Sequence, residues 1–475
     1  MALILILFPL LIAGLALALP SNRARPWLLP LTGLVHSATT LLVLRSPDQK
    51  TYNSWLLLDP VSTIILITVS GLFLLSSFYA VGYLHHRIEQ SNRFFVASLS
   101  AFLSLISLAI WSHHLGLMWV AIEGTTLTTA PLIYFNKSKQ SIEATWKYLL
   151  VGSVGIALAL LGTFFLAYSA IAGGKEASLD LASLLQTAPD MSRSWLRSAF
   201  ILLLVGYGTK MGLAPMHTWK PDAYGEAPGI VGAILAGGVT SGAFLALLRM
   251  YQILLAAGEG AFASRILIFM GLFSMLTAAI FMINQRDFKR MLAYSSIEHM
   301  GILVLGVGLG GLALWGALFH VMMNAFTKGT LFLSAGNIHR AYKDKSTDAV
   351  QGAYRRLPFS ASLFLAGFFA ITGSPPFGLF VSEFSILTGA FGSGHYLAGS
   401  LFLLFLLLVF IGMGITVLKV VQGRVPEEVE HSEYRDSVLT VVPPLVFLLV
   451  VLLLGVYIPP FPRDLISQAQ LFLGN

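Results

Sequence analysis

Long apolar runs recur along the whole chain, and they decide what it can fold into. The 475 residues contain about fourteen runs of the length needed to cross a bilayer as a helix. Because 56% of the residues are hydrophobic and 11% are charged, the chain has more apolar surface than a soluble domain buries. The sequence therefore predicts an all-α integral membrane protein with about 14 transmembrane helices. The predicted spans are 2–19, 27–44, 56–84, 95–111, 115–134, 145–172, 198–215, 228–250, 265–284, 291–309, 312–335, 361–391, 398–420 and 438–458.

The connections between these runs are too short to form a soluble domain. We therefore expect a single membrane domain over residues 1–475. Its first three spans occupy 1–84, two groups of five spans follow at about 95–250 and 265–420, and the last span lies at about 438–458.

Two of the spans are interrupted by helix-breaking residues. Span seven contains Gly212 and Pro215, and span twelve contains the GSPPFG segment 373–378. An acidic residue follows each break, Glu226 in the first case and Glu383 in the second. Paired broken spans in corresponding positions indicate inverted repeats, so we expect two inverted five-helix repeats with broken helices 7 and 12. Two unrelated kinks are the alternative interpretation.

The distribution of lysine and arginine predicts the orientation in the membrane. The loops after odd-numbered spans and their flanks hold 19 of these residues and the opposite side holds 8, while Lys210 and Lys328 lie within spans. Cytoplasmic loops carry such an excess, so we expect both termini on the non-cytoplasmic side. The net charge of +7 is then loop charge, and it does not indicate a partner that is a nucleic acid.

The chain contains no cysteine, which excludes disulfides and cysteine-ligated zinc or iron–sulfur clusters within it. We find no nucleotide-binding loop and no defensible pair of haem-ligating histidines. The histidine pair at 113–114 is more typical of a loop at the aqueous interface than of a metal site. We therefore expect no cofactor and no metal in this chain.

Charged residues within the apolar runs are the candidates for function, because ionisable groups at that depth are costly. Glu123 lies in the middle of the run LGLMWVAIEGTTLTTAPLIYF, where a carboxylate is either paired with a cation or protonated. Lys210 in the first broken helix is its natural partner, and His217 follows just beyond Pro215. A purely structural ion pair and a hydrogen-bonded structural histidine are the alternatives.

A second group of titratable residues lies in the second half of the chain. His320, Asn324 and Lys328 are spaced by four and so line one face of a helix. Together with Glu383, these groups predict a polar axis along the membrane midplane that conducts protons through side chains and waters. The residues assigned to the proton path are Glu123, Lys210, His217, His299, His320, Lys328 and Glu383.

Three stretches resemble the antiporter-like membrane subunits of respiratory complex I. They are 208–228 (GTKMGLAPMHTWKPDAYGEAP), 285–301 (QRDFKRMLAYSSIEHMG), and the run 320–328 followed by 373–384. The same family includes Mrp-type sodium/proton antiporters and energy-converting hydrogenases, and the first stretch is most similar to the hydrogenase-4 (formate hydrogenlyase) type. The resemblance extends over about residues 55–420.

The resemblance implies roles for particular residues. Glu123 and Lys210 match the glutamate and lysine that pair in the first repeat. His320 and Lys328 match the histidine and central lysine of the second, and Glu383 matches its terminal lysine or glutamate.

The chain also departs from the family pattern. Many members have a further lysine where this chain has Ser241, so the link between the halves must use water, Thr240, Ser241 or His299, or it is broken. Lys220 replaces a usual leucine and is expected to add a charge on the cytoplasmic side. The chain ends soon after the last predicted span, so we expect no long lateral helix.

The sequence thus predicts a proton-translocating subunit of a redox-driven complex in the inner membrane of a bacterium or archaeon. Its partners would be the lipid bilayer and the other membrane and peripheral subunits of a complex I-like oxidoreductase or membrane-bound hydrogenase. The chain itself would carry no redox centre. The alternatives are a subunit of an Mrp-type Na⁺/H⁺ antiporter and a scaffold that has lost transport. A transporter of sugars or peptides fits poorly, because the side chains expected in a cavity are few and titratable and include no cluster suited to such substrates.

Overall fold

A computed structural model of the chain describes residues 1–430 and 433–474, and it consists of helices joined by short loops. Nine of the described helices are long and apolar enough to cross a membrane, and each overlaps a predicted span. The prediction of an all-helical membrane protein is therefore confirmed. The nine are η1–α2 (Arg25–Arg45), α3 (Pro60–His85), α4 (Arg93–Trp111), α6 (Lys139–Ala172), α10–η5–α11 (Gly229–Ala256), α12 (Gly260–Met282), α13 (Phe288–Leu309), α18 (Tyr396–Val421) and α20 (Val438–Val456).

The other predicted spans correspond to helices that are shorter or more polar. Three of these helices carry the charged residues that the sequence places within apolar runs, namely Glu123, Lys210 and Lys328. The helices are α1 (Ala2–Ala18), α5 (Leu115–Ile133), α8 (Arg193–Met211), α14 (Gly311–Tyr342), α16 (Pro358–Ile371) and α17 (Gly378–Gly392).

The chain is interrupted at both predicted breaks. α8 ends at Met211, where Gly212 adopts a φ of +76°, and the chain resumes as the short helix α9 (Trp219–Glu226). α16 ends at Ile371, Gly373 has a φ of +63°, and α17 begins at Gly378. Glycine adopts positive φ without the steric cost that a side chain adds, so it stops both helices abruptly.

Some elements were not expected from the sequence. The long helix after α9 consists of α10 (Gly229–Ile234), a π-helical turn η5 (Leu235–Val239) and α11 (Thr240–Ala256). Two short helices, α7 (Leu181–Thr187) and α21 (Pro460–Phe472), lie in segments that had no assignment. α21 follows the last predicted span and packs against α3 and α14.

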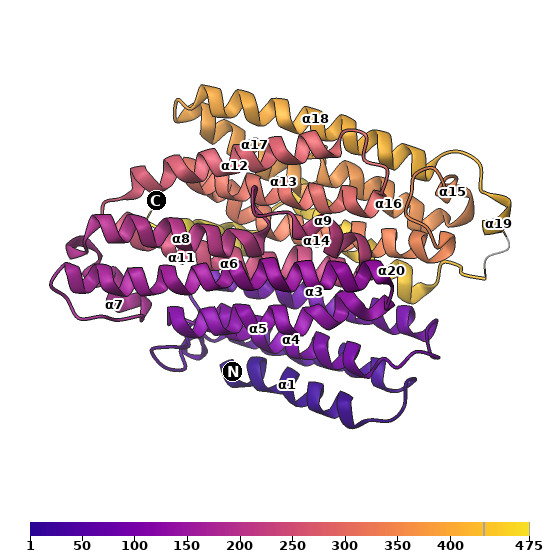
Figure 1. The fold of residues 1–475 in the computed structure, drawn as a ribbon, viewed down its shortest axis with the longest axis horizontal. Helices are drawn as coiled ribbons and strands as arrows, with labels where there is room; N and C mark the ends of the chain where they lie inside the picture. The colour runs from indigo at the N-terminus through magenta and orange to yellow at the C-terminus, as the bar shows by residue number, and fades with distance from the viewer. Residues whose placement is uncertain (431–432, 475) are drawn as a thin grey trace.

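Hydrogen bonds between loops divide the bundle into two ends. At one end they join the loops after α1, α3 and α5 to the end of α14, and α15 (Ala353–Arg356) and α19 (Glu427–Glu430) lie there as well. The bonds at this end are Asn22 Nδ2 to Ile88 O (3.1 Å), Arg87 Nη1 to Asn136 Oδ1 (2.8 Å) and Arg340 Nη2 to His86 O (2.5 Å). Those at the other end are His113 N to Trp55 O (2.7 Å), Leu115 N to Leu179 O (2.8 Å) and Gln252 Nε2 to Phe472 O (2.9 Å). Figure 1 shows the N and C marks toward the left and α15 and α19 at the right. Successive loops thus alternate between the ends, as the predicted topology requires.

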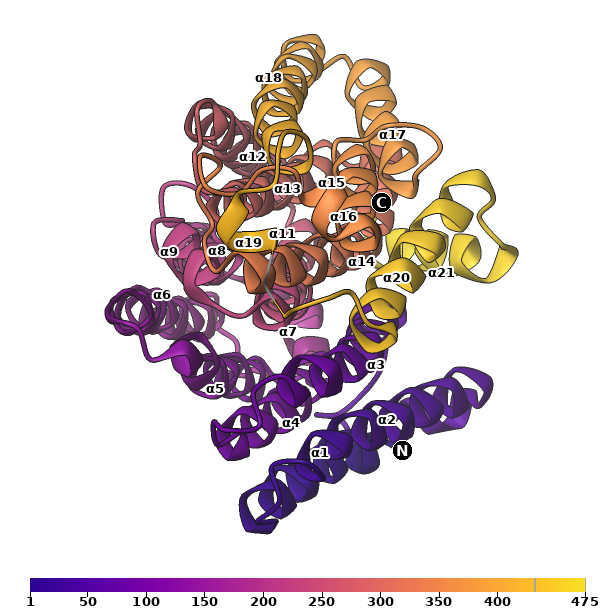
Figure 2. The same ribbon diagram turned by 90° about the vertical axis from the view of Figure 1, so that its right-hand side faces the viewer.

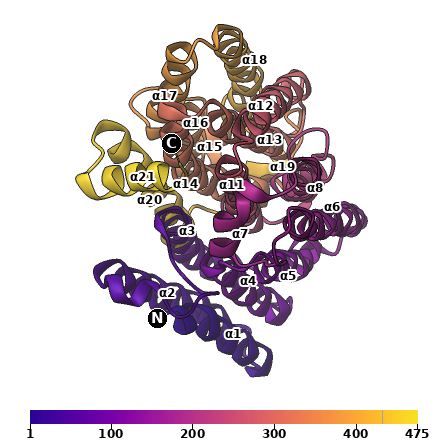
Figure 3. The same cartoon turned by 90° about the vertical axis from the view of Figure 1, so that its left-hand side faces the viewer.

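The centre of the bundle is formed by α11, α13 and α14. α14 contacts α3, α10, α13, α16, α17, α20 and α21. The most apolar stretch of α10–η5–α11, long enough to cross a membrane, is completely buried within the bundle. Figures 2 and 3 show α1 and α2 at one edge and α18 at the opposite edge, with α14 between them. The outermost helices expose large apolar side chains, while Lys210, Lys328 and Glu383 are buried inside. Apolar residues outside and ionisable groups inside fit a protein surrounded by lipid.

Cysteine labelling can test which end faces the cytoplasm, because the chain has no cysteine of its own. Gln140 and Glu176 are exposed near opposite ends of α6. We expect a membrane-impermeant maleimide to reach Glu176→Cys from outside intact cells, whereas Gln140→Cys reacts after permeabilisation. The reverse pattern would contradict the orientation predicted from lysine and arginine.

Candidate functional site

The first cluster of buried charge lies where α5, α6 and α8 meet, and we call Glu123, Thr126 and Lys210 the Lys210 centre. The Lys210 Nζ atom lies 3.1 Å from Glu123 Oε2 and also donates to Thr126 Oγ1. The Lys210 side chain is 1% exposed, whereas that of Glu123 is 20% exposed. Lys210 lies in the last turn of α8, where the partial negative charge of the helix end favours a cation. The predicted partnership between Glu123 and Lys210 is present.

The second cluster lies between α13 and α14, and we call Ser295, Glu298 and Lys328 the Lys328 centre. The Lys328 Nζ atom donates to Ser295 Oγ at 2.7 Å and to Leu292 O at 3.3 Å. In the described residues no carboxylate oxygen lies within 4.0 Å of it, although the buried Glu298 interacts with it electrostatically. Lys328 is therefore held by neutral groups with a carboxylate at longer range.

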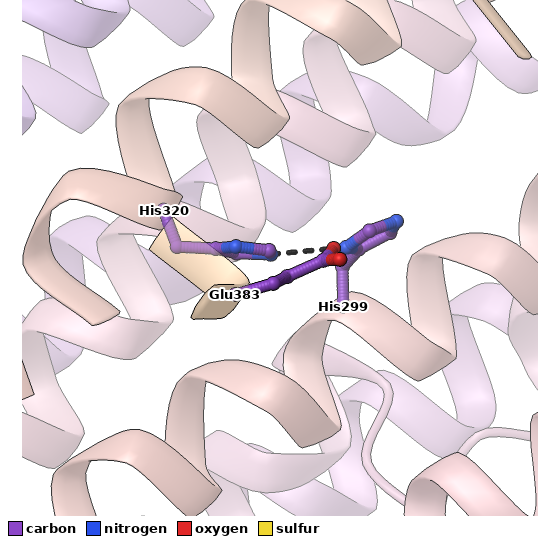
Figure 4. Close-up of side chains that lie close together, drawn as sticks. All are labelled: His299, His320 and Glu383. Carbon is purple, nitrogen blue, oxygen red and sulfur yellow. Dashed lines mark hydrogen bonds between the residues drawn. The ribbon is translucent and has the colours of Figure 1, made fainter. Parts of the chain in front are cut away.

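The third cluster joins α13, α14 and α17, and we call His299, His320, Ser382 and Glu383 the histidine cluster. Figure 4 shows His299, His320 and Glu383. His299 Nδ1 and His320 Nε2 are 2.9 Å apart, and His320 Nδ1 is 2.8 Å from Ser382 Oγ. The Ser382 hydroxyl donates to Leu379 O at 2.8 Å. Ser382 therefore accepts a hydrogen bond from His320 Nδ1–H, and His320 Nε2 accepts one from His299. His299, His320 and Ser382 therefore form one hydrogen-bonded chain.

The same cluster contains the residues best placed to bind a metal ion. Ligand atoms of His299, His320 and Glu383 all lie within 4.8 Å of one another. However, the two imidazoles are hydrogen-bonded to each other, and a metal would have to replace that bond. Glu383 Oε1 and His299 Nε2 are buried and have no hydrogen-bond partner among the described residues. Buried polar atoms of this kind are usually satisfied by water.

His217 is the predicted site residue that lies apart from these clusters. It follows the first break, is half-buried, and its ring centroid lies 6.3 Å from that of Phe281. No hydrogen bond or ion pair joins it to Lys210 within the part of the chain that the structure describes. The structure therefore brings together five of the seven predicted residues, Glu123 with Lys210 and His299 with His320 and Glu383. Lys328 contacts Ser295 and Leu292, which were not predicted, and His217 lies at the margin.

The expectation that Lys220 adds a charge on the cytoplasmic side is wrong. Its side chain is completely buried, and its Nζ atom lies 2.5 Å from Met211 O and 3.4 Å from Ser296 O. It turns inward because Gly212 leaves the space: a Cβ atom there would lie 2.5 Å from the Lys220 side chain. The sequence could have indicated this burial, because a lysine stands directly after Trp219 at a position where the family usually has leucine.

The hydroxyl groups proposed to link the two halves are engaged elsewhere. Thr240 Oγ1 donates to Ala236 O and Ser241 Oγ donates to Gly237 O, both at 2.6 Å within their own helix.

Sequence analysis also missed a fourth buried charge cluster, which lies further along α11. There Asp59 accepts from Arg249 Nη2 and lies 2.9 Å from His113 Nε2, so this loop histidine is buried.

Comparisons with known proteins agree with this arrangement. The model of the family described as "NADH:quinone oxidoreductase/Mrp antiporter, TM" matches residues 112–430. The chain is similar to a hydrogenase-4 component F homolog of Methylacidiphilum infernorum (isolate V4), with 35% identity over 466 residues and 96% of each chain covered. It is also similar to NADH-quinone oxidoreductase subunit N of Desulforudis audaxviator (strain MP104C), with 31% identity over 411 residues, 83% of this chain and 81% of that one.

A solved structure has the same fold. A chain of the membrane-bound sulfane sulfur reductase (MBS), an archaeal respiratory membrane complex, aligns with a TM-score of 0.88. The alignment covers 99% of this chain and 97% of that chain at 20% sequence identity.

The Glu123–Lys210 contact can be tested by a double-mutant cycle. We expect Glu123→Gln to lower the free energy of unfolding in detergent by about 1–3 kcal/mol, because Lys210 then lacks its anion. The double variant Glu123→Gln/Lys210→Met should lose less free energy of unfolding than the sum of the losses in the two single variants, because it leaves no unpaired charge. Unfolding by titration with a denaturing detergent measures these differences.

The matched control is Glu143→Gln, which breaks the exposed pair between Glu143 Oε1 and Lys147 Nζ (2.7 Å). An exposed pair contributes little, so this variant should remain near wild type. Strictly additive losses in the double variant Glu123→Gln/Lys210→Met would show that the two side chains do not stabilise each other.

Proposed function

The chain belongs to the family of transmembrane subunits shared by NADH:quinone oxidoreductases and Mrp antiporters, and on this premise we propose that it translocates protons within a redox-driven complex. The family resemblance predicted from the motifs is confirmed, including the likeness to the hydrogenase-4 type. Among the possible complexes we favour a membrane-bound hydrogenase, because of the similarity to the hydrogenase-4 component F homolog. A complex I-like NADH:quinone oxidoreductase is the second candidate for the complex to which this chain belongs.

The observation that carries this proposal is the buried ion pair of Glu123 and Lys210 at the end of a broken helix. The lysine is enclosed by protein, while the carboxylate reaches the surface of the bundle. A pair of this kind separates when a third charge approaches, and the freed lysine then releases or binds a proton. Its 3.1 Å separation allows strong coupling between the protonation states of the two groups.

The remaining clusters extend this pair into a path. In the proposed mechanism a proton enters near Lys210 from the cytoplasmic side, and the charge moves through the interior toward Lys328. The histidine cluster then accepts it, and release occurs near Lys328 or Glu383. This chain would supply no redox chemistry, which we assign to partner subunits. His217, which lies nearer the surface than the clusters, would act at the entrance.

We further propose fourteen spans with both termini on the non-cytoplasmic face of a bacterial or archaeal inner membrane. The nine long helices and the shorter ones support this number, and the alternation of loops supports the topology. The two broken helices lie in corresponding places of the segments 95–250 and 265–420, which supports inverted repeats.

The partial exposure of Glu123 supports a partner in the plane of the membrane. Around it the bundle exposes apolar side chains, among them Val120, Leu127, Leu150 and Val154. A carboxylate in contact with lipid is unfavourable, so we expect a neighbouring membrane subunit to cover this face. The relatives of the chain are subunits of respiratory complexes, in keeping with such a neighbour.

Replacing the central lysine tests the proposed function. We expect Lys210→Met to lower the number of protons moved per electron by at least tenfold, because a methionine cannot carry the proton. The assembled complex would be reconstituted in liposomes with an internal pH-sensitive dye and driven by the hydrogen or NADH that its partner enzyme oxidises. Lys175→Met, which changes a loop lysine paired with Asp190, is the control and should leave the ratio unchanged. An unchanged ratio in Lys210→Met would mean that the path does not run through this lysine.

The antiporter alternative also has a specific basis, since the family description includes Mrp antiporters. Capture of the tagged chain in mild detergent, followed by mass spectrometry and metal analysis, separates the choices. We expect a hydrogenase large subunit with nickel and iron–sulfur proteins. A flavin-containing, NADH-oxidising arm would indicate complex I instead. Membrane subunits alone, without metal and with sodium-driven proton flux in the absence of an electron donor, would establish the antiporter.

A further inference from the structure

Lys220 is a buried lysine to which the proposed path gives no role. It belongs to α9, just beyond the first helix break, and its side chain is completely buried. Among residues 1–430 and 433–474, no carboxylate oxygen lies within 4.0 Å of its ammonium group. A buried ammonium without an anion is costly, so the position calls for an explanation.

The Lys220 ammonium lies between the two lysine centres. On one side it donates to the carbonyl of Met211, the residue that follows Lys210. On the other side it donates to Ser296 O, while the adjacent Ser295 accepts from Lys328. Lys220 and Lys328 therefore contact consecutive residues of α13.

The surroundings of Lys220 are suited to water. The hydroxyl groups of Tyr224 and Ser296 are buried and interact with each other, and neither has a further hydrogen-bond partner among the described residues. The Tyr224 ring centroid lies 5.6 Å from the Lys220 Nζ atom. Further along, His299 Nε2 and Asn324 Oδ1 lack partners as well. Such atoms are commonly satisfied by ordered water, so the interior near Lys220 offers polar groups to which water can bind.

We propose that Lys220 is the relay that carries protons from the Lys210 centre to the Lys328 centre. The inference rests on the proposed function, because it assigns a residue to that same path. A proton leaves the Lys210 ammonium, crosses water to the free amine of Lys220, and leaves the resulting ammonium for the amine of Lys328. Each transfer breaks one N–H bond and forms another, and no further reactant is needed. Lys220 thus supplies the titratable link that Thr240 and Ser241, both bonded within their own helix, do not supply.

A purely structural role is the competing explanation. The Lys220 ammonium lies on the last turn of α8, and a cation at the C-terminal end of a helix stabilises it. Arginine distinguishes the two roles, because it keeps the positive charge and the hydrogen bond but does not lose its proton in proteins. A structural lysine is replaceable by arginine, whereas a relay is not.

The experiment compares Lys220→Leu and Lys220→Arg with Lys210→Met and the loop control Lys175→Met. Each complex is reconstituted in liposomes, assembly is checked by recovery of the partner subunits, and protons moved per electron are measured as above. We expect the number of protons moved per electron to be at least tenfold lower in both Lys220 variants than in the wild type. Retention of the wild-type ratio by either variant would overturn the relay, and retention by Lys220→Arg alone would establish the structural role. If Lys220→Leu does not assemble, Lys220→Arg decides.

The outcome for Lys210→Met separates this inference from the proposed function. If Lys210→Met abolishes pumping and the Lys220 variants do not, the path exists but bypasses Lys220. If Lys210→Met pumps normally, the proposed function fails, whatever the Lys220 variants do. Loss in all three variants, with an intact Lys175→Met control, supports both.

Discussion

The desolvation of the ammonium groups of Lys210, Lys220 and Lys328 is a free-energy cost around which the centre of this bundle is arranged. Removing an ion from water costs several kcal/mol even after relaxation, so each group needs a substitute for its hydration shell. Lys210 receives a carboxylate and a hydroxyl, Lys328 a hydroxyl and a carbonyl, and Lys220 two carbonyls. The partners of the three lysines differ in charge, and these differences determine which ammonium group binds its proton most strongly.

The first helix break is what makes the Lys220 solution possible. Because α8 stops at Met211, its last carbonyl groups have no partner within the helix and can accept from a lysine. Small residues then let the ammonium groups approach. A Cβ atom at Gly152 would lie 3.1 Å from Lys210 Nζ, and one at Gly212 would lie 3.0 Å from Lys220 Nζ. A break that the sequence marks with glycine and proline is therefore also the place where charge is accommodated.

The sequence was sufficient to predict the features that depend on charged residues within apolar runs. Glu123, Lys210 and Lys328 interrupt apolar runs, so their burial and the pairing of the first two could be predicted. Lys220 could not, because it lies in a polar segment that reads as a loop, and its inward course depends on the space left by Gly212. The π-helical turn η5 next to Ser241 could not be predicted either, because no local pattern indicates it.

The same electrostatics explain how a rigid bundle can couple distant events. Two unit charges about 10 Å apart interact by about 2 kcal/mol at an effective dielectric constant of about 20, enough to change a protonation equilibrium by more than tenfold. Three lysines in one interior, with Glu123 paired to Lys210 and Glu298 at longer range from Lys328, therefore disfavour being charged together. Because Glu123 also reaches the surface, a charge in a neighbouring subunit can loosen its hold on Lys210. Under the proposed function, a proton displaced there would change the protonation equilibrium of Lys220 and then of Lys328 through electrostatic interaction.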